Sequence, residues 1–477
     1  MRRFRAWQGM SNWMRTTPGR LRLQSLLVAC AALALLTTGS GGVVAVLVTE
    51  TNVHQRTVRE IVGVQRLHAW LAAADRSAAN SYLSGGAELT LPQQQYEADV
   101  AAASRELEQA AGYQSGADPV GKQLAAISQS FGEYTRLVDT AMVQHRLGNA
   151  DGMTALRAAS DLMHSTSDGI LAQVEAVERM CAAELNQANL ILTIATGVLA
   201  AFLVSAVVAL GLLVWTQRFV TRRFRRRRNK RLLAATLAVF VVSGGTGFGV
   251  YGAQQSILQS QGVYARLLNL WHARSLAYDA NGDTSLYLIA GAPGGATTDT
   301  AFQGDTGKLV DRPLTDGLLS AARRGDVRFS GLLAEELQSA DSQSERDAAL
   351  RVIQAYRQFI DIDASVHAQA ASGHQTAAVT LTLGSYGAPL GLAFKSLDWG
   401  PKLGAQRDWS EGELGFAFEE FDWDLAQLTQ LLQTQFDATM TAVEQLLTET
   451  LLLQAVSVMI AYLTFSGVGP RIAEYSV

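Results

Sequence analysis

The sequence predicts an all-α membrane protein with four transmembrane helices and two extracytoplasmic helical bundles in tandem. Three observations lead to this fold class. Four apolar runs are each about 20 residues long, which is the length needed to cross a bilayer. A strongly basic loop separates the second run from the third. The two long segments that follow the first and third runs are acidic and rich in helix-forming residues.

The predicted spans are residues 23–48, 190–215, 232–253 and 451–468. The loop 216–231 carries nine basic residues and no acidic one. Lys and Arg collect in short loops on the cytoplasmic side of membranes, so we expect this loop to anchor the chain at the cytoplasmic face of the lipid bilayer. Its densest part consists of Arg222, Arg223, Arg225, Arg226, Arg227 and Arg228.

The charges of the other segments predict the order of compartments. The N-terminal stub 1–22 is basic, segment 49–189 has 17 acidic and 10 basic residues, and segment 254–450 has 25 and 13. We therefore expect both acidic segments outside and both termini, including the tail 469–477, in the cytoplasm. This order describes a multi-pass protein of a bacterial cell (inner) membrane. The alternative, a soluble protein with four buried core helices, is disfavoured by the basic loop.

Small residues interrupt the first and third spans at 38–42 (TGSGG) and 244–249 (GGTGFG). Such residues let helices approach closely in lipid, so we expect these two spans to pack against each other at their outer halves. No charged residue lies inside a predicted span. Intramembrane ionisable groups usually mark ion or proton routes, and their absence argues against a transporter.

Segment 49–189 is expected to form four helices in an antiparallel bundle, because its helix breakers come in three short clusters. These clusters are Gly85-Gly86 with Pro92, the stretch 116–119, and Gly148-Asn149. The third predicted helix has apolar residues in a 3-then-4 spacing that is typical of a buried seam. The seam residues are Leu124, Ile127, Phe131, Tyr134, Val138, Ala141 and His145.

Segment 254–450 repeats features of the first segment. Without gaps, several residues of the seam match residues located 222 positions later, and a Tyr-Leu pair near the start of each segment matches at an offset of 205. Together with the repeated span–bundle–span layout, these matches suggest an internal duplication. The matched pairs include Tyr134 with Tyr356, Ala141 with Asp363, His145 with His367, and Tyr82 with Tyr287.

Asp363 and His367 are a candidate ligand-binding or pH-responsive pair, because they lie one helical turn apart on the predicted seam. A carboxylate beside a histidine favours the protonated imidazole. The alternative is a hydrogen-bonded pair at the edge of the core with no further role.

The second segment also contains an insert, 398–424, that has no match in the first segment and mixes acidic with aromatic residues. Aromatic residues are enriched at binding interfaces, so we interpret the insert as a docking surface for an extracytoplasmic partner. The alternative is a flap that covers the bundle. We expect a helix to run from about residue 411 into the fourth span. The candidate docking residues are Trp399, Trp409, Phe416, Phe421 and Trp423.

The sequence contains no pattern that indicates catalysis. It has no nucleotide-binding motif, no metal-ligand spacing and no nucleophile–base pair, so we predict neither enzymatic activity nor a cofactor nor a metal site. The glycines at 244–249 lie inside an apolar span and indicate helix packing. The basic loop is held between two spans, which favours membrane anchoring and disfavours nucleic-acid binding.

Each span–bundle–span half resembles the four-helix-bundle sensor domains of bacterial chemoreceptors and sensor kinases, but the cytoplasmic signalling domains of those proteins are lacking. Two such units, four spans and a basic loop are similar to the GlnX-type actinobacterial membrane relay proteins. That resemblance implies an extracytoplasmic solute-binding protein that senses amino acids and a cytoplasmic Ser/Thr kinase as effector. It supplies no site residues.

We therefore predict a non-enzymatic relay that couples an extracytoplasmic cue to a cytoplasmic kinase or other effector. The cue is expected to be an amino-acid-loaded solute-binding protein. The alternatives are an envelope scaffold and a transport-associated accessory subunit. A homo-oligomer is compatible with each of these three functions.

Overall fold

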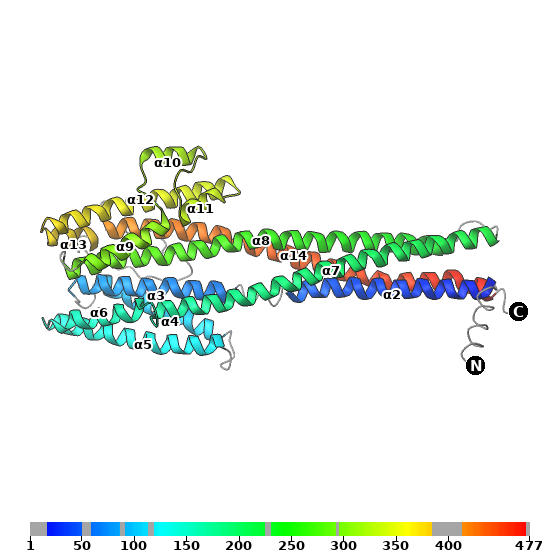
Figure 1. Cartoon of the computed structure of the whole chain (residues 1–477), viewed down its shortest axis with the longest axis horizontal. Coiled ribbons are helices and arrows are strands. Elements are labelled where there is room, and N and C mark those ends of the chain that lie inside the picture. Colours follow the sequence, from blue (N-terminus) through cyan, green and yellow to red (C-terminus); the bar gives the residue numbers. More distant parts are fainter. Residues whose placement is uncertain are drawn as a thin grey trace. The chain divides into compact units, whose positions relative to one another are not determined.

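The computed structural model describes residues 17–49, 59–85, 91–112, 119–224, 230–291, 295–383 and 413–473. Every element in these ranges is an α-helix (Figure 1). The helices are α2 (Thr17–Thr49), α3 (Arg59–Leu83), α4 (Leu91–Gly112), α5 (Pro119–Arg146), α6 (Asp151–His164), α7 (Ile170–Phe224), α8 (Lys230–Ala290), α9 (Ala296–Leu309), α10 (Asp316–Arg323), α11 (Leu332–Gln338), α12 (Gln343–Ala371), α13 (Gln375–Leu383) and α14 (Leu414–Ala473).

The chain divides into two compact units. The first, which we call the apolar unit, consists of Met1–Arg56, Glu184–Gln261 and Asp437–Val477. The second, which we call the charged unit, consists of Thr57–Ala183 and Gly262–Phe436. Both acidic segments of the sequence therefore contribute to one compact unit.

Three helices in the described part of the chain are long and apolar enough to cross a membrane, at Leu23–Val44, Gly197–Phe219 and within Lys230–Ala290. They contain or overlap the first three predicted spans. Large apolar side chains such as Phe240 (68% exposed) point outward from them, and lipid would cover such a surface. The predicted fourth span, 451–468, lies in α14 and is not one of these three helices. Several side chains of this stretch lie outside the described residues.

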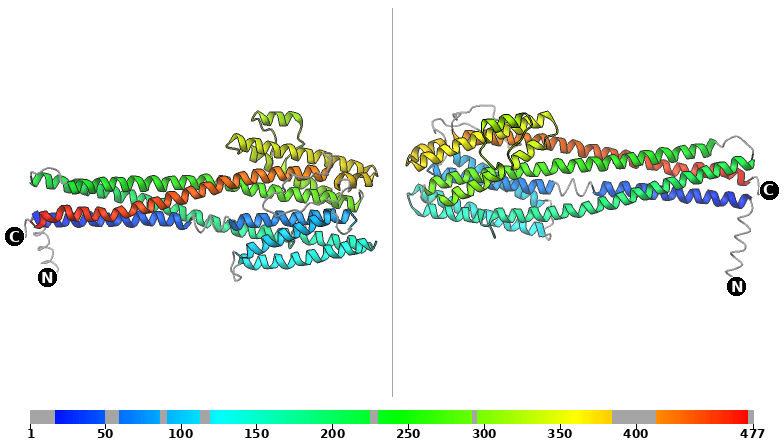
Figure 2. Two further views of the ribbon diagram at one scale, coloured as in Figure 1. Left: turned by 180° about the vertical axis from the view of Figure 1, so that it is seen from behind. Right: turned by 45° about the horizontal axis from the view of Figure 1, so that its top comes forward.

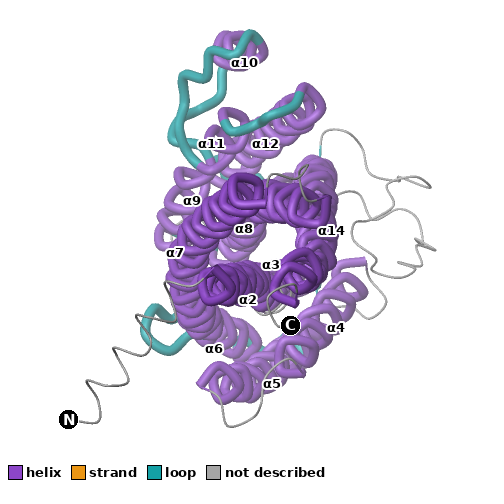
Figure 3. Tube along the Cα trace, turned by 90° about the vertical axis from the view of Figure 1, so that its right-hand side faces the viewer, coloured by secondary structure: helices purple, strands orange, loops and turns teal. Residues whose placement is uncertain are grey.

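Two core clusters lie in the apolar unit: one joins α2, α7, α8 and α14, and the other joins the outer parts of α2, α8 and α14. Figure 3 shows these helices viewed end-on. The buried side chains of the first cluster are small and branched aliphatic groups plus one aromatic ring, which suits close helix packing in lipid. Representative members are Val28 and Leu35 of α2, Phe202 and Leu213 of α7, Val239 and Val242 of α8, and Ile460 of α14.

The outer ends of the first and third spans share a core cluster through Val43 of α2 and Val250 of α8, as expected from their small residues, and α14 belongs to the same cluster. The closest contacts of the glycines in the two runs are with side chains of α14, which the sequence did not indicate. A Cβ atom at Gly39 would lie 2.6 Å from Oε1 of Gln454. A Cβ atom at Gly249 would collide with the Thr450 side chain. The side-chain amide of Gln454 also donates a hydrogen bond to Thr246 Oγ1 of α8. The glycines thus leave room for polar side chains of α14 inside the apolar unit.

In the charged unit, α3, α4, α5 and α6 lie side by side, and α9, α11, α12 and α13 lie beside α8 and α14 (Figure 2). The short α10 lies outside them, in contact with α12. The predicted seam of α5 is buried from Leu124 to Ala141, as the spacing indicated. The last predicted helix of the first segment is two helices, because α6 ends at His164 and α7 begins at Ile170. Asp168 accepts hydrogen bonds from Ser165 and Ser167 in the intervening turn.

Candidate functional site

The α12 helix positions the predicted Asp363–His367 pair. Ser342 precedes the helix and accepts a hydrogen bond from the Glu345 backbone N–H, and Gly373 follows the helix with a φ of 80°. Between these ends the helix is continuous, so residues four apart share one face. Asp363 is 3% exposed, and its Oδ2 lies 3.1 Å from His367 Nδ1. Its Oδ1 accepts a hydrogen bond of 2.6 Å from Thr284 of α8.

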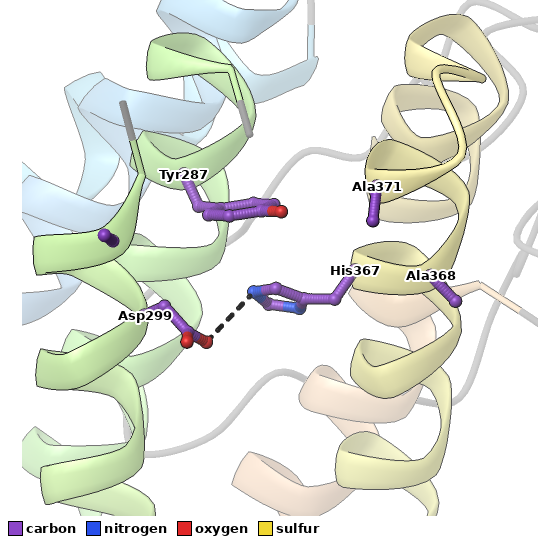
Figure 4. A pocket seen from close by; sticks show the side chains of 6 residues that line it. Tyr287, Asp299, His367, Ala368 and Ala371 are labelled. Carbon is purple, nitrogen blue, oxygen red and sulfur yellow. Dashed lines mark ion pairs between the residues drawn. The ribbon is translucent and has the colours of Figure 1, made fainter. Parts of the chain in front are cut away.

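The His367 ring lies in an aromatic setting. Its centroid is 4.4 Å from the ring centroid of Tyr287 and 5.7 Å from that of Phe302. A Cβ atom at Gly295 would collide with the Tyr287 ring, so a residue without a side chain is needed beside the stack. His367 Nε2 points toward Asp299 Oδ1 at 3.9 Å, as Figure 4 shows.

The charge of His367 follows from these neighbours. Burial opposes protonation, but the hydrogen bond to Asp363 and the charges of Asp363 and Asp299 outweigh it and raise the pKa of His367 above its usual value. The raised pKa of His367 agrees with the expectation from the sequence that the Asp363 carboxylate favours the protonated imidazole. A role in ligand binding or pH sensing stays a prediction.

An open cavity of about 460 Å³ adjoins this pair. It lies between α8 and α9 on one side and α12 on the other (Figure 4). In the described part of the chain no group of His, Cys, Asp or Glu is arranged to hold a metal ion. The residues that line the cavity are Tyr287, Ala296, Asp299, His367, Ala368 and Ala371.

The first segment contains a related Tyr–His pair. Tyr82 and His145, which match Tyr287 and His367 in the sequence comparison, have ring centroids 4.1 Å apart. Ala141 occupies the position that matches Asp363. The first segment therefore has the ring pair without the carboxylate that orients the imidazole in the second.

A second group of charged residues joins helices of both segments at the centre of the charged unit. The Arg274 guanidinium of α8 donates two hydrogen bonds to Asp422 of α14, at 2.6 Å and 2.7 Å. Arg76 of α3 donates one to Glu419 of α14 at 3.4 Å. Arg76, Arg274 and Asp422 are each at least 93% buried. We call these four residues the charged core.

Aromatic rings surround the charged core. The Arg76 guanidinium carbon lies 4.6 Å from the ring centroid of Phe418, and that of Arg274 lies 5.4 Å from Trp271 and 5.6 Å from Trp70. Such contacts are attractive when the cation is desolvated. Neither arginine was predicted from the sequence as a functional residue. Their signal was an arginine inside a helical stretch that is mostly apolar, LAAADRSAAN for Arg76, where Asp75 precedes it, and WHARSLAY for Arg274.

A third group centres on Asp75 of α3. Its Oδ2 lies 2.9 Å from His164 Nε2 of α6, and its Oδ1 accepts a hydrogen bond of 2.9 Å from the Tyr134 hydroxyl. Burial opposes protonation of His164, but the hydrogen bond and charge of Asp75 raise the pKa of this histidine to about 10. Burial raises the pKa of Asp283 on α8 to about 8 and that of Asp279 to about 6.

The predicted docking residues fall into two sets. Phe416 and Phe421 lie in α14 with exposures of 6% and 0%, so both belong to the core of the charged unit. Trp423 is half-buried in the same helix, and Trp399 and Trp409 lie outside the described residues. The part of the predicted insert from 414 to 424 is thus the start of a 60-residue helix. Partner docking by this segment stays a prediction.

Of the arginines predicted to anchor the loop, Arg222 is exposed near the end of α7, the helix that also contains Arg223. Arg225, Arg226, Arg227 and Arg228 lie outside the described residues.

Comparison with known proteins gives one match. Residues 49–189 match the family model of the actinobacterial sensor domain. This range is the first of the two acidic segments and does not include the second. No curated protein and no solved structure matches the chain. The match supports a sensing or signalling role, and the three apolar helices suggest a membrane protein.

Proposed function

We propose that this protein relays an extracytoplasmic cue across the cell membrane to a cytoplasmic effector, with four spans, both termini in the cytoplasm and the two acidic segments outside. The cue is the loaded state of an amino-acid-binding protein, and the effector is a kinase. The sensor-domain match of residues 49–189 supports the sensing half of this proposal. The three apolar helices support the membrane half.

The observation that carries the relay is the continuity of α8 and α14 between the two units. Each is a single helix, of 61 and 60 residues, that contributes to both. Within the charged unit, Asp422 of α14 is held by Arg274 of α8. Within the apolar unit, Gln454 of α14 is hydrogen-bonded to Thr246 of α8. A helix fixed at both places can transmit a small axial shift or tilt along its length.

Shifts of about 1–2 Å between packed helices are a known means of passing a signal. The charged core is where such a shift would begin, because Arg76 and Arg274 attach α14 to helices from both acidic segments. A cue that moves one acidic segment relative to the other would therefore change the forces on α14.

The test changes the external amino-acid supply and measures the phosphorylation of cytoplasmic proteins. We expect the response to disappear in cells that lack the protein and in cells with Asp422→Asn, which leaves Arg274 without its carboxylate. An Arg179→Ala variant, which removes an exposed pair with Glu175, serves as the matched control and should respond normally. Protein levels in the membrane fraction are measured alongside. An unchanged response in the deletion strain would refute the relay and favour an envelope scaffold.

A further inference from the structure

The Thr284–Asp363–His367 chain fixes the His367 imidazole and leaves one of its nitrogens for another molecule. Thr284 donates to one oxygen of Asp363, and the other oxygen lies 3.1 Å from His367 Nδ1. The Nδ1 side of the ring is therefore fully used. Its tilted stacking on Tyr287 restricts the ring further. A side chain held in this way presents Nε2 in a fixed direction.

The Nε2 atom is buried and has no hydrogen-bond partner among the described residues. The closest opposite charge is Asp299 Oδ1, and 3.9 Å is too long for a hydrogen bond. The Asp299 side chain is 42% exposed, so this acceptor is also open to a molecule that enters the cavity. A buried polar atom without a partner is unfavourable, and a molecule that supplies the missing bond would gain from it.

His367 Nε2 and Asp299 Oδ1 define complementary atoms on a ligand, while the other carboxylate oxygen of Asp299 accepts a hydrogen bond from Gln303. When the imidazole is protonated, Nε2 donates and requires an acceptor on the ligand, and the Asp299 carboxylate accepts and requires a donor. Ligand atoms that make hydrogen bonds of about 2.9 Å to two groups 3.9 Å apart can lie about 3 Å from each other. Polar atoms on neighbouring carbons have this separation. The remaining walls are the Tyr287 side chain and the small apolar side chains of Ala296, Ala368 and Ala371.

From this geometry we propose that the His367 cavity binds a small organic molecule that carries a hydrogen-bond acceptor and a donor on adjacent carbon atoms. A 1,2-diol, a 2-hydroxy acid and a 2-amino acid all have this arrangement. The acceptor faces His367 Nε2, the donor faces Asp299, and the short carbon skeleton lies against the alanines. The biological meaning of this inference rests on the proposed sensing function. Binding to the cavity does not depend on that function, because binding is measured directly.

The first segment supplies an internal control. It has the stacked rings of Tyr82 and His145 but has Ala141 at the position that matches Asp363. A Cβ atom at Gly152 would lie 3.2 Å from the Tyr82 hydroxyl, so the space beside that stack is filled by the α6 backbone. A change at His145 therefore alters a similar ring pair at a place without the oriented imidazole and the opposing carboxylate.

The experiment uses the full-length protein in detergent micelles and four three-carbon probes. Lactate, alanine and propane-1,2-diol each carry the vicinal pair, and propionate has the acceptor without the donor. Binding is measured by saturation-transfer NMR and titration. We expect at least one of the first three probes to bind, and propionate to bind at least about tenfold more weakly than that probe.

Variants locate the site. Asp299→Asn and His367→Gln should each weaken binding by about tenfold or more, and His145→Gln should leave it unchanged. Asp299 is on the surface, so its variant is expected to fold even if the His367 variant does not. The probe that binds shows whether the ligand is a neutral diol, a hydroxy acid or an amino acid.

The proposal is wrong if none of the three vicinal probes binds, or if binding of the one that does is unaffected by Asp299→Asn. Binding that follows these expectations, together with an unchanged phosphorylation response in the deletion strain, would instead count against the relay and leave the binding site standing.

Discussion

Arg274 and Asp422 illustrate how a buried ion pair is tolerated in the charged unit. Two charges removed from water are stable together only when their geometry is good and their other hydrogen-bonding groups are satisfied. Both guanidinium–carboxylate bonds are short, and Trp70, Trp271 and Tyr278 cover the faces of the guanidinium. Removal of one partner leaves the other charge buried.

We predict that Arg274→Met lowers the free energy of unfolding by about 3–5 kcal/mol, because Asp422 is left 3% exposed without its partner. The measurement is a denaturant titration of the detergent-solubilised protein. Arg179→Ala, which removes an exposed pair between residues four apart on α7, should change this free energy by no more than about 0.5 kcal/mol. Equal effects of the two substitutions would mean that the buried pair does not hold α14 in place.

His164 should make stability depend on alkaline pH. Its pKa in the folded protein is raised to about 10, above the ordinary value of 6.5, so its stabilising contribution is complete below pH 6.5 and is lost as the pH rises toward 10. Asp283, with a pKa raised to about 8, changes stability in the same direction over a lower range. The ring of His164 is 36% exposed, and solvent weakens the effect.

We therefore expect the thermal midpoint to fall between pH 6.5 and pH 10, and this fall to be smaller in His164→Gln. Asp75, Asp279 and Asp283 act on this histidine, Tyr134 donates to Asp75, and all four remain in the variant. A variant whose midpoint follows the same pH curve as the parent would show that His164 is not the group responsible.

At the scale of helices, the contact between α8 and α14 in the apolar unit depends on glycines. Gly245 and Gly249 lie one turn apart on α8, and a Cβ atom at either would collide with a side chain of α14. The residues met are Leu453 and Thr450. Close approach of this kind is typical of small-xxx-small helix pairs in membranes.

We predict that Gly249→Leu separates α14 from α8 and destabilises the protein by about 1–3 kcal/mol, as overpacking does in other cores. Gly244→Leu is the control, because a Cβ atom there has no neighbour within 4 Å. The readout is thermal unfolding in detergent, together with disulfide trapping between cysteines introduced at positions 246 and 454 after Cys30 and Cys181 are replaced by serine. Efficient trapping in Gly249→Leu would contradict the prediction.

For the whole molecule, the proposed topology predicts two classes of surface. In intact cells, single cysteines in the charged unit should react with a membrane-impermeant maleimide, and cysteines in the loop 216–231 should react only after lysis. Exposed positions such as Arg136 and Arg328 suit the first class, and Arg222 suits the second. Labelling of the Arg222 position in intact cells would overturn the topology and the relay with it.

Composition and period alone determined the helical class, the three apolar helices and the buried seam of α5, because each depends on residues close together in the chain. They also found one residue pair of the candidate site, Asp363 and His367, which are only four positions apart. Tertiary structure decided the rest. Asp422 is 148 positions from Arg274, and no local pattern identifies such a partner.

The same reason explains the corrections. The glycine runs indicated close packing but could not name α14 as their neighbour, since a small residue specifies a short distance and no particular partner. Phe416 and Phe421 were interpreted as surface, because aromatic residues among acids look alike in sequence whether they face solvent or the core. Only the fold shows that Glu419 and Asp422 pair with buried arginines and that Phe416 and Phe421 of the same helix are buried.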